Sequence, residues 1–207
     1  MQKIKTAIVG TGFMGRVHAE QVRRLGNVEI AAVVGSRPET AKKFAEAQGI
    51  AIATDKLEEV LANKEIVAVH ICTPNVDHFP QSMAALNAGK AVLCEKPMTT
   101  TAEEARQLVA LAKQKNAINC VQHNLRYYPV LQQVREMIAA GDLGDILIVQ
   151  GTYSQDWLLY DTDWNWRIDT KENGQLRVMG DIGSHWMDMI QHLTGLEITA
   201  VCADLAT

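Results

Sequence analysis

The sequence predicts an α/β protein in which an N-terminal, doubly wound parallel sheet is followed by a smaller, partial α+β domain. Two observations predict this class. Short apolar segments alternate with helical segments through about residue 122, which is the pattern of strands and helices in a parallel sheet. A glycine-rich stretch, "GTGFMG", directly follows the first apolar segment and opens the first helical one.

The individual elements support this interpretation. The segment "IVAVHICT" is apolar at nearly every position, which is typical of a central parallel strand that is buried on both faces. Pro38 opens one predicted helix and Gly49 closes it, while Thr101 and Glu104 fit a capping box at the start of another. The predicted strands of this region cover residues 4–10, 28–35, 66–73, 90–97 and 117–122.

The alternation stops after residue 122, so we expect one domain at residues 1–122 and a second at 123–207. The second region predicts a helix, an irregular part rich in Trp and Asp, a further helix and only two strands, at residues 145–156 and 197–207. Two strands alone are weakly stable and leave exposed edges. We therefore expect this second domain to be incomplete, or to be completed by another chain.

Composition narrows the classes of function. The chain has 207 residues, of which 47% are hydrophobic and 21% charged, with a net charge of -4. This charge does not favour nucleic acid as a partner, and no apolar run is long enough to cross a membrane. The start, "MQKIKTAIVG", lacks a secretory signal, so a cytoplasmic protein is expected. The four cysteines form no CxxC pair and predict buried, reduced thiols: Cys72, Cys94, Cys120 and Cys202.

The glycine-rich stretch predicts a site for a dinucleotide. Gly10 permits a tight turn, Gly12 lets the backbone approach a pyrophosphate, and Gly15 permits close packing of helix and strand. Phe13 and Met14 complete the loop at the helix N-terminus, where free N–H groups and the helix dipole favour phosphate. A structural glycine turn is the alternative, but the strand before it and the helix after it favour binding.

The end of the second strand bears on the choice of dinucleotide. A carboxylate there would bind the ribose of NAD, but this chain has Gly35, Ser36 and Arg37. Arg37 would pair with the 2′-phosphate of NADP, unless it is only a solvated surface charge. The sequence therefore predicts NADP or NAD, with NADP slightly favoured.

Two further groups of polar residues follow strand ends, where ligands bind in open α/β sheets. Thr73, Pro74, Asn75 and His78 follow the strand "IVAVHICT", although His78 has capping of the next helix as an alternative role. Glu95 and Lys96 follow "KAVLC". Lys96 is thereby directed toward the crevice beside the nicotinamide, where it would hydrogen-bond a substrate hydroxyl; an ordinary surface lysine is the alternative.

The stretch "GDIGSHWMD" places Asp181, His185 and Asp188 on one face of a helix that also carries large apolar residues. A histidine is suited to act as a base near neutral pH, with a carboxylate one turn away to orient it. A metal site is one alternative, but the sequence shows no convincing cluster of further ligands. A structural alternative is a buried histidine and carboxylate that hydrogen-bond each other in the core. Candidate substrate contacts outside the helix are Arg126, Trp157, Trp164, Trp166 and Arg167. Packing at the domain junction is an equal alternative for the tryptophans, and pairing with surface carboxylates is the alternative for the arginines.

Taken in order, "GTGFMG", "EKP" and "GDIGSHWMD" resemble the Gfo/Idh/MocA family of oxidoreductases over essentially the whole chain. The segments "NLRYYP" and "WNWR" also resemble segments typical of that family. The resemblance implies a Rossmann domain followed by an α+β domain with a mostly antiparallel sheet. It also implies that His185 is the general acid/base and that Lys96 and Asp181 bind and orient the substrate.

The resemblance further implies sugars, polyols or inositols as substrates, and a homodimer or homotetramer. Family members continue well beyond this chain, which is C-terminally short by comparison. We therefore expect an NAD(P)-dependent dehydrogenase or reductase that acts on a CH–OH group. The alternatives are a dinucleotide-binding sensor or regulator without turnover, and a different Rossmann enzyme such as an amino-acid or hydroxy-acid dehydrogenase.

Overall fold

The computed structural model describes residues 3–205, which form two compact units. The first unit holds the chain up to Gln122 together with Asn165–Arg177, and the second holds His123–Trp164 and the chain from Val178 onward. The segment Asn165–Arg177 lies beyond the predicted domain boundary in the sequence, yet it packs with the first unit.

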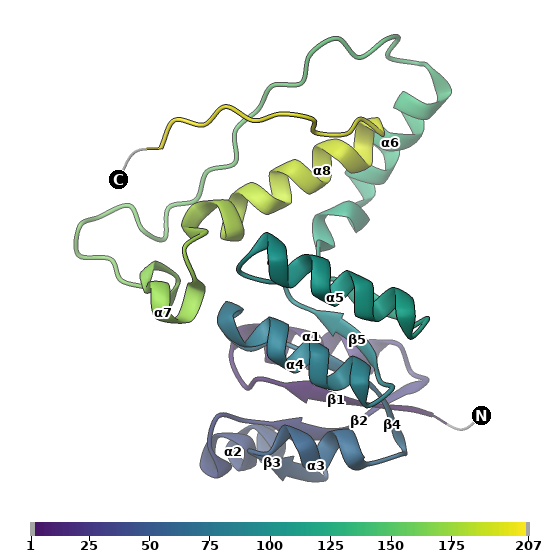
Figure 1. Cartoon of the computed structure of the whole chain (residues 1–207), viewed down its shortest axis with the longest axis vertical. Coiled ribbons are helices and arrows are strands. Elements are labelled where there is room, and N and C mark those ends of the chain that lie inside the picture. The colour runs from purple at the N-terminus through teal and green to yellow at the C-terminus, as the bar shows by residue number, and fades with distance from the viewer. Residues whose placement is uncertain (1–2, 206–207) are drawn as a thin grey trace. The chain divides into compact units, whose positions relative to one another are not determined.

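The first unit is built on a six-stranded sheet with the strand order β3-β2-β1-β4-β5-β6 (Figure 1). All five strand pairs are parallel, which confirms the predicted doubly wound sheet. Strand order reverses between β1 and β4, and this is where such sheets leave a crevice for ligands. The strands are β1 (Ile4–Val9), β2 (Val28–Val34), β3 (Ile52–Thr54), β4 (Ile66–Ile71), β5 (Ala91–Cys94) and β6 (Asn119–Val121).

Helices bury both faces of this sheet. One core cluster joins the sheet to residues of α3, α4 and α5, and a second joins it to residues of α1 and α2. The predicted helix ends are confirmed, because the Thr101 side chain accepts from the backbone N–H of Glu104 at 3.2 Å and Gly49 ends α2 with φ at +59°. The helices are α1 (Phe13–Arg24), α2 (Pro38–Gln48), α3 (Leu57–Ala62), α4 (Asn75–Asn87) and α5 (Ala102–Gln114).

The second unit is helical in its described part. A 3-10 turn at Asn124–Tyr127 precedes α6 (Pro129–Ala140), and a π-helical turn at Met179–Gly183 leads into α8 (Ser184–Thr194). The strands expected at residues 145–156 and 197–207 are absent from residues 145–156 and 197–205, while residues 206–207 lie outside the described chain.

The physical reason for these missing strands is the lack of pairing. A strand is stable only when neighbouring strands satisfy its backbone groups, and the described part of this unit provides no neighbour. The side chains of Leu147 and Val201 are accordingly 92% and 83% exposed. The antiparallel sheet expected for this domain is therefore not formed by the described residues.

The prediction of buried thiols is wrong for two of the four cysteines. Cys72 and Cys94 are buried, but Cys120 and Cys202 are exposed; all four are free thiols. Cys120 lies on β6, the edge strand of the sheet, where burial is incomplete. Within residues 3–205, every helix is too short or too polar to cross a membrane.

Candidate functional site

The three glycines of "GTGFMG" form the turn between β1 and α1, and each has a different steric reason to lack a side chain. Gly10 has φ at +106°, and an added Cβ would lie 2.5 Å from the carbonyl oxygen of Cys72. An added Cβ at Gly15 would lie 2.1 Å from the carbonyl oxygen of Gly10. At Gly12 the same Cβ would meet no atom within 4 Å. The fold itself thus requires glycine at positions 10 and 15, because a side chain there would clash with the backbone. The space beside Gly12 is instead open for a ligand.

This turn also satisfies the requirements of a phosphate group. Gly12 is the N-cap of α1, and no side chain caps the first turn of that helix. The first turn carries no acidic residue. The N-terminus of α1 therefore offers backbone N–H groups and the positive end of the helix dipole without a side-chain cap or a repelling carboxylate, which favours the pyrophosphate of a dinucleotide.

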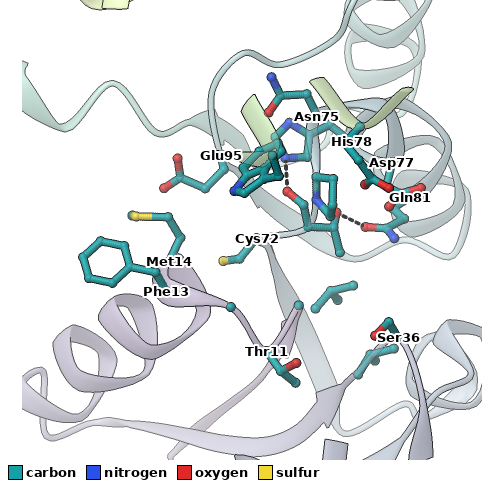
Figure 2. A pocket seen from close by; sticks show the side chains of 18 of the residues that line it. Thr11, Phe13, Met14, Ser36, Cys72, Asn75, Asp77, His78, Gln81 and Glu95 are labelled. Carbon is teal, nitrogen blue, oxygen red and sulfur yellow. Dashed lines mark hydrogen bonds between the residues drawn. The ribbon is translucent and has the colours of Figure 1, made fainter. Parts of the chain in front are cut away.

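The turn borders a cavity of about 980 Å³, shown in Figure 2, which is as large as the largest typical ligand pockets. All of its walls belong to the first unit. Eleven predicted cofactor residues lie along it: Gly10, Gly12, Phe13, Met14, Ser36, Thr73, Pro74, Asn75, His78, Glu95 and Lys96.

Two predicted cofactor residues are not part of this wall. Gly15 serves the packing of α1 on β1. Arg37 is exposed at the start of α2 and does not line the cavity. Asp55, which the sequence analysis missed, lines the cavity together with Ser36. The parallel pairing of β3 with β2 brings their carboxyl ends together, and the short β3 gave too weak a pattern to predict this.

His78 lies on α4 and is 1% exposed. Its Nδ1 atom lies 2.7 Å from the carbonyl oxygen of Pro97, and its Nε2 atom lies 2.9 Å from that of Thr73. Burial lowers the pKa of His78, against the opposite effect of these two carbonyl oxygens. His78 therefore links the turn after β4 to the turn that carries Lys96.

The segment Asn165–Arg177 contributes Asn165, Trp166, Arg167 and Glu172 to the cavity wall. Arg167 stacks on Trp166, with the guanidinium carbon 4.7 Å from the ring centroid. Two of the predicted substrate residues, Trp166 and Arg167, therefore lie along the same cavity as the glycine turn.

The second unit holds the remaining predicted residues. Arg126 binds Asp188 through two hydrogen bonds, from Nε to Oδ2 at 2.7 Å and from Nη2 to Oδ1 at 2.5 Å. The Nδ1 atom of His123 lies 3.9 Å from the same carboxylate. Burial alone would raise the pKa of Asp188, but the hydrogen bonds and charge of Arg126 hold it below its usual range. The paired Arg126 and Asp188 therefore connect the 3-10 turn to α8.

His185 lies on α8, one turn before Asp188. Its ring packs edge-on against the rings of His123 and Tyr153, with centroid distances of 5.5 and 6.3 Å. Asp181 lies in the π-helical turn that precedes α8. Lys96 belongs to the first unit, whereas Asp181 and His185 belong to the second. Among residues 3–205, no group of three His, Cys, Asp or Glu side chains is arranged to hold a metal ion.

The parallel sheet, the glycine turn and the large cavity beside it define the class of proteins with a dinucleotide-binding Rossmann fold. Residues 4–123 match the family described as "Oxidoreductase family, NAD-binding Rossmann fold", and residues 131–207 match the "GFO/IDH/MocA C-terminal domain". The chain belongs to the Gfo/Idh/MocA family, as its motifs predicted.

Several characterised relatives are dehydrogenases. The chain is 32% identical to levoglucosan dehydrogenase of Pseudarthrobacter phenanthrenivorans, an alignment that covers 100% of the chain and 55% of that protein. It is 33% identical to scyllo-inositol 2-dehydrogenase (NADP(+)) of Bacillus subtilis, over 93% of the chain and 52% of that protein. The chain thus spans about half the length of these relatives.

Solved structures agree with this assignment. A levoglucosan dehydrogenase in complex with NADH and L-sorbose superimposes with a TM-score of 0.90 at 30% identity, over 94% of this chain and 54% of that one. An oxidoreductase domain protein from Kribbella flavida superimposes with a TM-score of 0.89 at 29% identity, over 94% and 55% of the two chains.

Proposed function

We propose that the chain is part of an oxidoreductase that transfers a hydride between a nicotinamide dinucleotide and a CH–OH group of a sugar, polyol or inositol-like substrate. The observation that carries this proposal is the cavity of about 980 Å³, which combines the open glycine turn with Glu95, Lys96 and Trp166. The levoglucosan and scyllo-inositol dehydrogenases among the relatives support the substrate class.

The bound dinucleotide would supply the hydride acceptor, and the residues of this chain would hold the substrate and move its proton. We assign Lys96 to a hydrogen bond with the reacting hydroxyl, because it follows β5 at the cavity wall. His185 would take the hydroxyl proton as the general base, with Asp181 orienting the substrate. Trp166 and Arg167 would contact the substrate along the cavity. Because Arg126 is hydrogen-bonded to Asp188, we propose that Arg126 fixes the position of α8 within its unit.

The preference for NADP over NAD stays a prediction. Arg37 favours the 2′-phosphate of NADP, as its sequence position indicated. The carboxylate of Asp55 on the cavity wall favours the unmodified ribose of NAD, because it repels a phosphate and accepts hydrogen bonds from hydroxyl groups. We propose that these two side chains influence the choice in opposite directions.

A dinucleotide-binding sensor without turnover is the second candidate. The observation that favours it is the second unit, whose described residues lack the sheet expected beside the catalytic helix. Such a protein would bind the dinucleotide with the first unit and would leave sugars and polyols unchanged.

Two measurements test the proposal in sequence. Fluorescence titration of the chain with NADH and NADPH is expected to show saturable binding, and a panel of sugars and polyols is then expected to reduce the oxidised cofactor. The His185→Ala variant is expected to lose most turnover and retain its dinucleotide affinity. Binding without turnover on any substrate would favour the sensor, and absence of binding would contradict both candidates.

A further inference from the structure

Three ionisable side chains form a continuous row that ends at the wall of the dinucleotide cavity. His18 on α1 lies between His70 on β4 and Glu95 at the end of β5. The Nε2 atom of His18 is 3.0 Å from Oε1 of Glu95, and its Nδ1 atom is 3.0 Å from Nδ1 of His70. His18 is 5% exposed and Glu95 is 6% exposed. Burying such groups is costly unless their hydrogen bonds and charges are satisfied within the row.

The Glu95 carboxylate determines which atom donates at its end of the row. An ionised Glu95 can only accept, so the Nε2 atom of His18 carries a hydrogen toward it. Burial lowers the pKa of His70 to about 4, with a further contribution from His18, so His70 is neutral at pH 7. A neutral imidazole offers either an N–H or a lone pair at Nδ1. His70 can therefore complete the row whether His18 is neutral or protonated.

The other ionisable groups around Glu95 limit what can balance its charge. Burial raises the pKa of Cys94 to about 12 and that of Cys72 well above its usual range, so both thiols stay neutral. Burial also lowers the pKa of His78. The groups that contact the Glu95 carboxylate directly are the imidazole of His18 and the backbone N–H of Lys96.

Glu95 connects this row to the candidate site. It lines the dinucleotide cavity together with Met14 of the glycine turn, and Figure 2 shows both side chains. Its Oε2 atom accepts from the backbone N–H of Lys96 at 3.3 Å. The same carboxylate therefore borders the cavity, contacts the peptide of Lys96 and receives the hydrogen of His18.

We propose that His18 is a positioning residue of the dinucleotide site, which fixes the Glu95 carboxylate at the cavity wall. This inference rests on the proposed function. Without the imidazole, the carboxylate would lose a hydrogen-bond partner from α1 and would be free to leave its position at the wall.

The test compares the affinities of the wild-type chain and of two variants for the reduced dinucleotide, NADH, by fluorescence titration at one fixed pH. The two variants differ in whether the side chain at position 18 can still donate a hydrogen bond to Glu95.

Two variants separate positioning from general structural support. The amide of His18→Gln can still donate to Glu95, so its affinity for the reduced form should stay near the wild-type value. His18→Leu cannot donate, and its affinity is expected to fall about tenfold. His192→Gln on α8 is the matched control, because it removes a titrating imidazole from the other unit. Folding of each variant is checked by circular dichroism.

The inference is overturned if folded His18→Gln loses as much affinity as His18→Leu, or if folded His18→Leu binds like the wild type. Should both variants unfold, nitrogen-15 NMR of the histidine rings in the wild-type chain decides. A hydrogen on Nε2 of His18 would support the inference, and an Nε2 atom without a hydrogen would contradict it. Failure of the wild-type chain to bind either NADH or NADPH would contradict the proposed function itself, while the same NMR measurement still reports on the pair with Glu95.

Discussion

Asn75 and Asn173 are 98 residues apart in the sequence, yet the side-chain amide of Asn75 donates a hydrogen bond to the side-chain oxygen of Asn173. Both side chains are buried, at 6% and 1% exposed. The Nδ2 atom of Asn173 donates in turn to the carbonyl oxygen of Arg167 at 2.7 Å. These bonds fasten the segment that carries Trp166 and Arg167 to the N-terminus of α4, at the wall of the candidate dinucleotide site.

Replacement of Asn173 by Ala is therefore expected to weaken both the fold and the site. The buried amide of Asn75 would lose its partner, at a cost of about 1–3 kcal/mol in the free energy of unfolding. Dinucleotide affinity should also fall, because Asn75, a predicted cofactor residue on the cavity wall, loses the partner that holds its side chain. Denaturant titration and fluorescence binding measure the two effects, with the exposed Asn87→Ala as the control. Unchanged stability and affinity in Asn173→Ala would show that the segment is held by other contacts.

The glycine turn gives a matched pair of variants. Gly15→Ala places a Cβ against the backbone oxygen of Gly10 and is expected to destabilise the fold by about 1–3 kcal/mol or more. Gly12→Ala meets no protein atom, so its stability should stay within about 1 kcal/mol of the wild type. Its dinucleotide affinity should nevertheless fall, because the methyl group enters the space assigned to the pyrophosphate. Normal NADH binding by Gly12→Ala would contradict the assignment of that space.

Stability is expected to depend on pH through His70. Burial lowers its folded-state pKa from 6.5 to about 4, so between these values the unfolded chain binds a proton that the folded chain does not. The free energy of unfolding should therefore decrease as the pH falls from about 6.5 to 4, by about 3 kcal/mol from this group. Urea titrations at several pH values measure this loss. His70→Gln should reduce it, and an equally steep loss in that variant would assign it to other groups.

Cofactor choice tests the opposed roles of Arg37 and Asp55. Arg37→Ala removes the charge that would pair with a 2′-phosphate, so the ratio of NADPH to NADH affinity should fall about tenfold. Asp55→Asn removes the opposing carboxylate and should raise the same ratio. Parallel fluorescence titrations with both cofactors give the ratio for each variant. Equal affinity ratios in the wild type and both variants would exclude these two side chains as determinants of the preference between NADPH and NADH.

Much of the first unit could be predicted because its signals are local. The alternation of apolar and helical segments, the capping box at Thr101 and the turn at Gly10 each depend on a few neighbouring residues. β3 was missed because three residues carry no usable periodicity. The two strands expected in the second unit were not formed, because pairing depends on neighbouring strands rather than on apolar composition.

The sequence by itself determined the family, the parallel sheet and the residue types at the glycine turn, since backbone conformation and burial pattern constrain these locally. Only the tertiary structure decided that Asp55 and the segment with Trp166 line the cavity, that Arg126 is bound to Asp188, and that His18 joins His70 to Glu95. Each of these relationships unites side chains from distant parts of the chain. Their proximity follows from strand order and helix packing, which no short sequence pattern encodes.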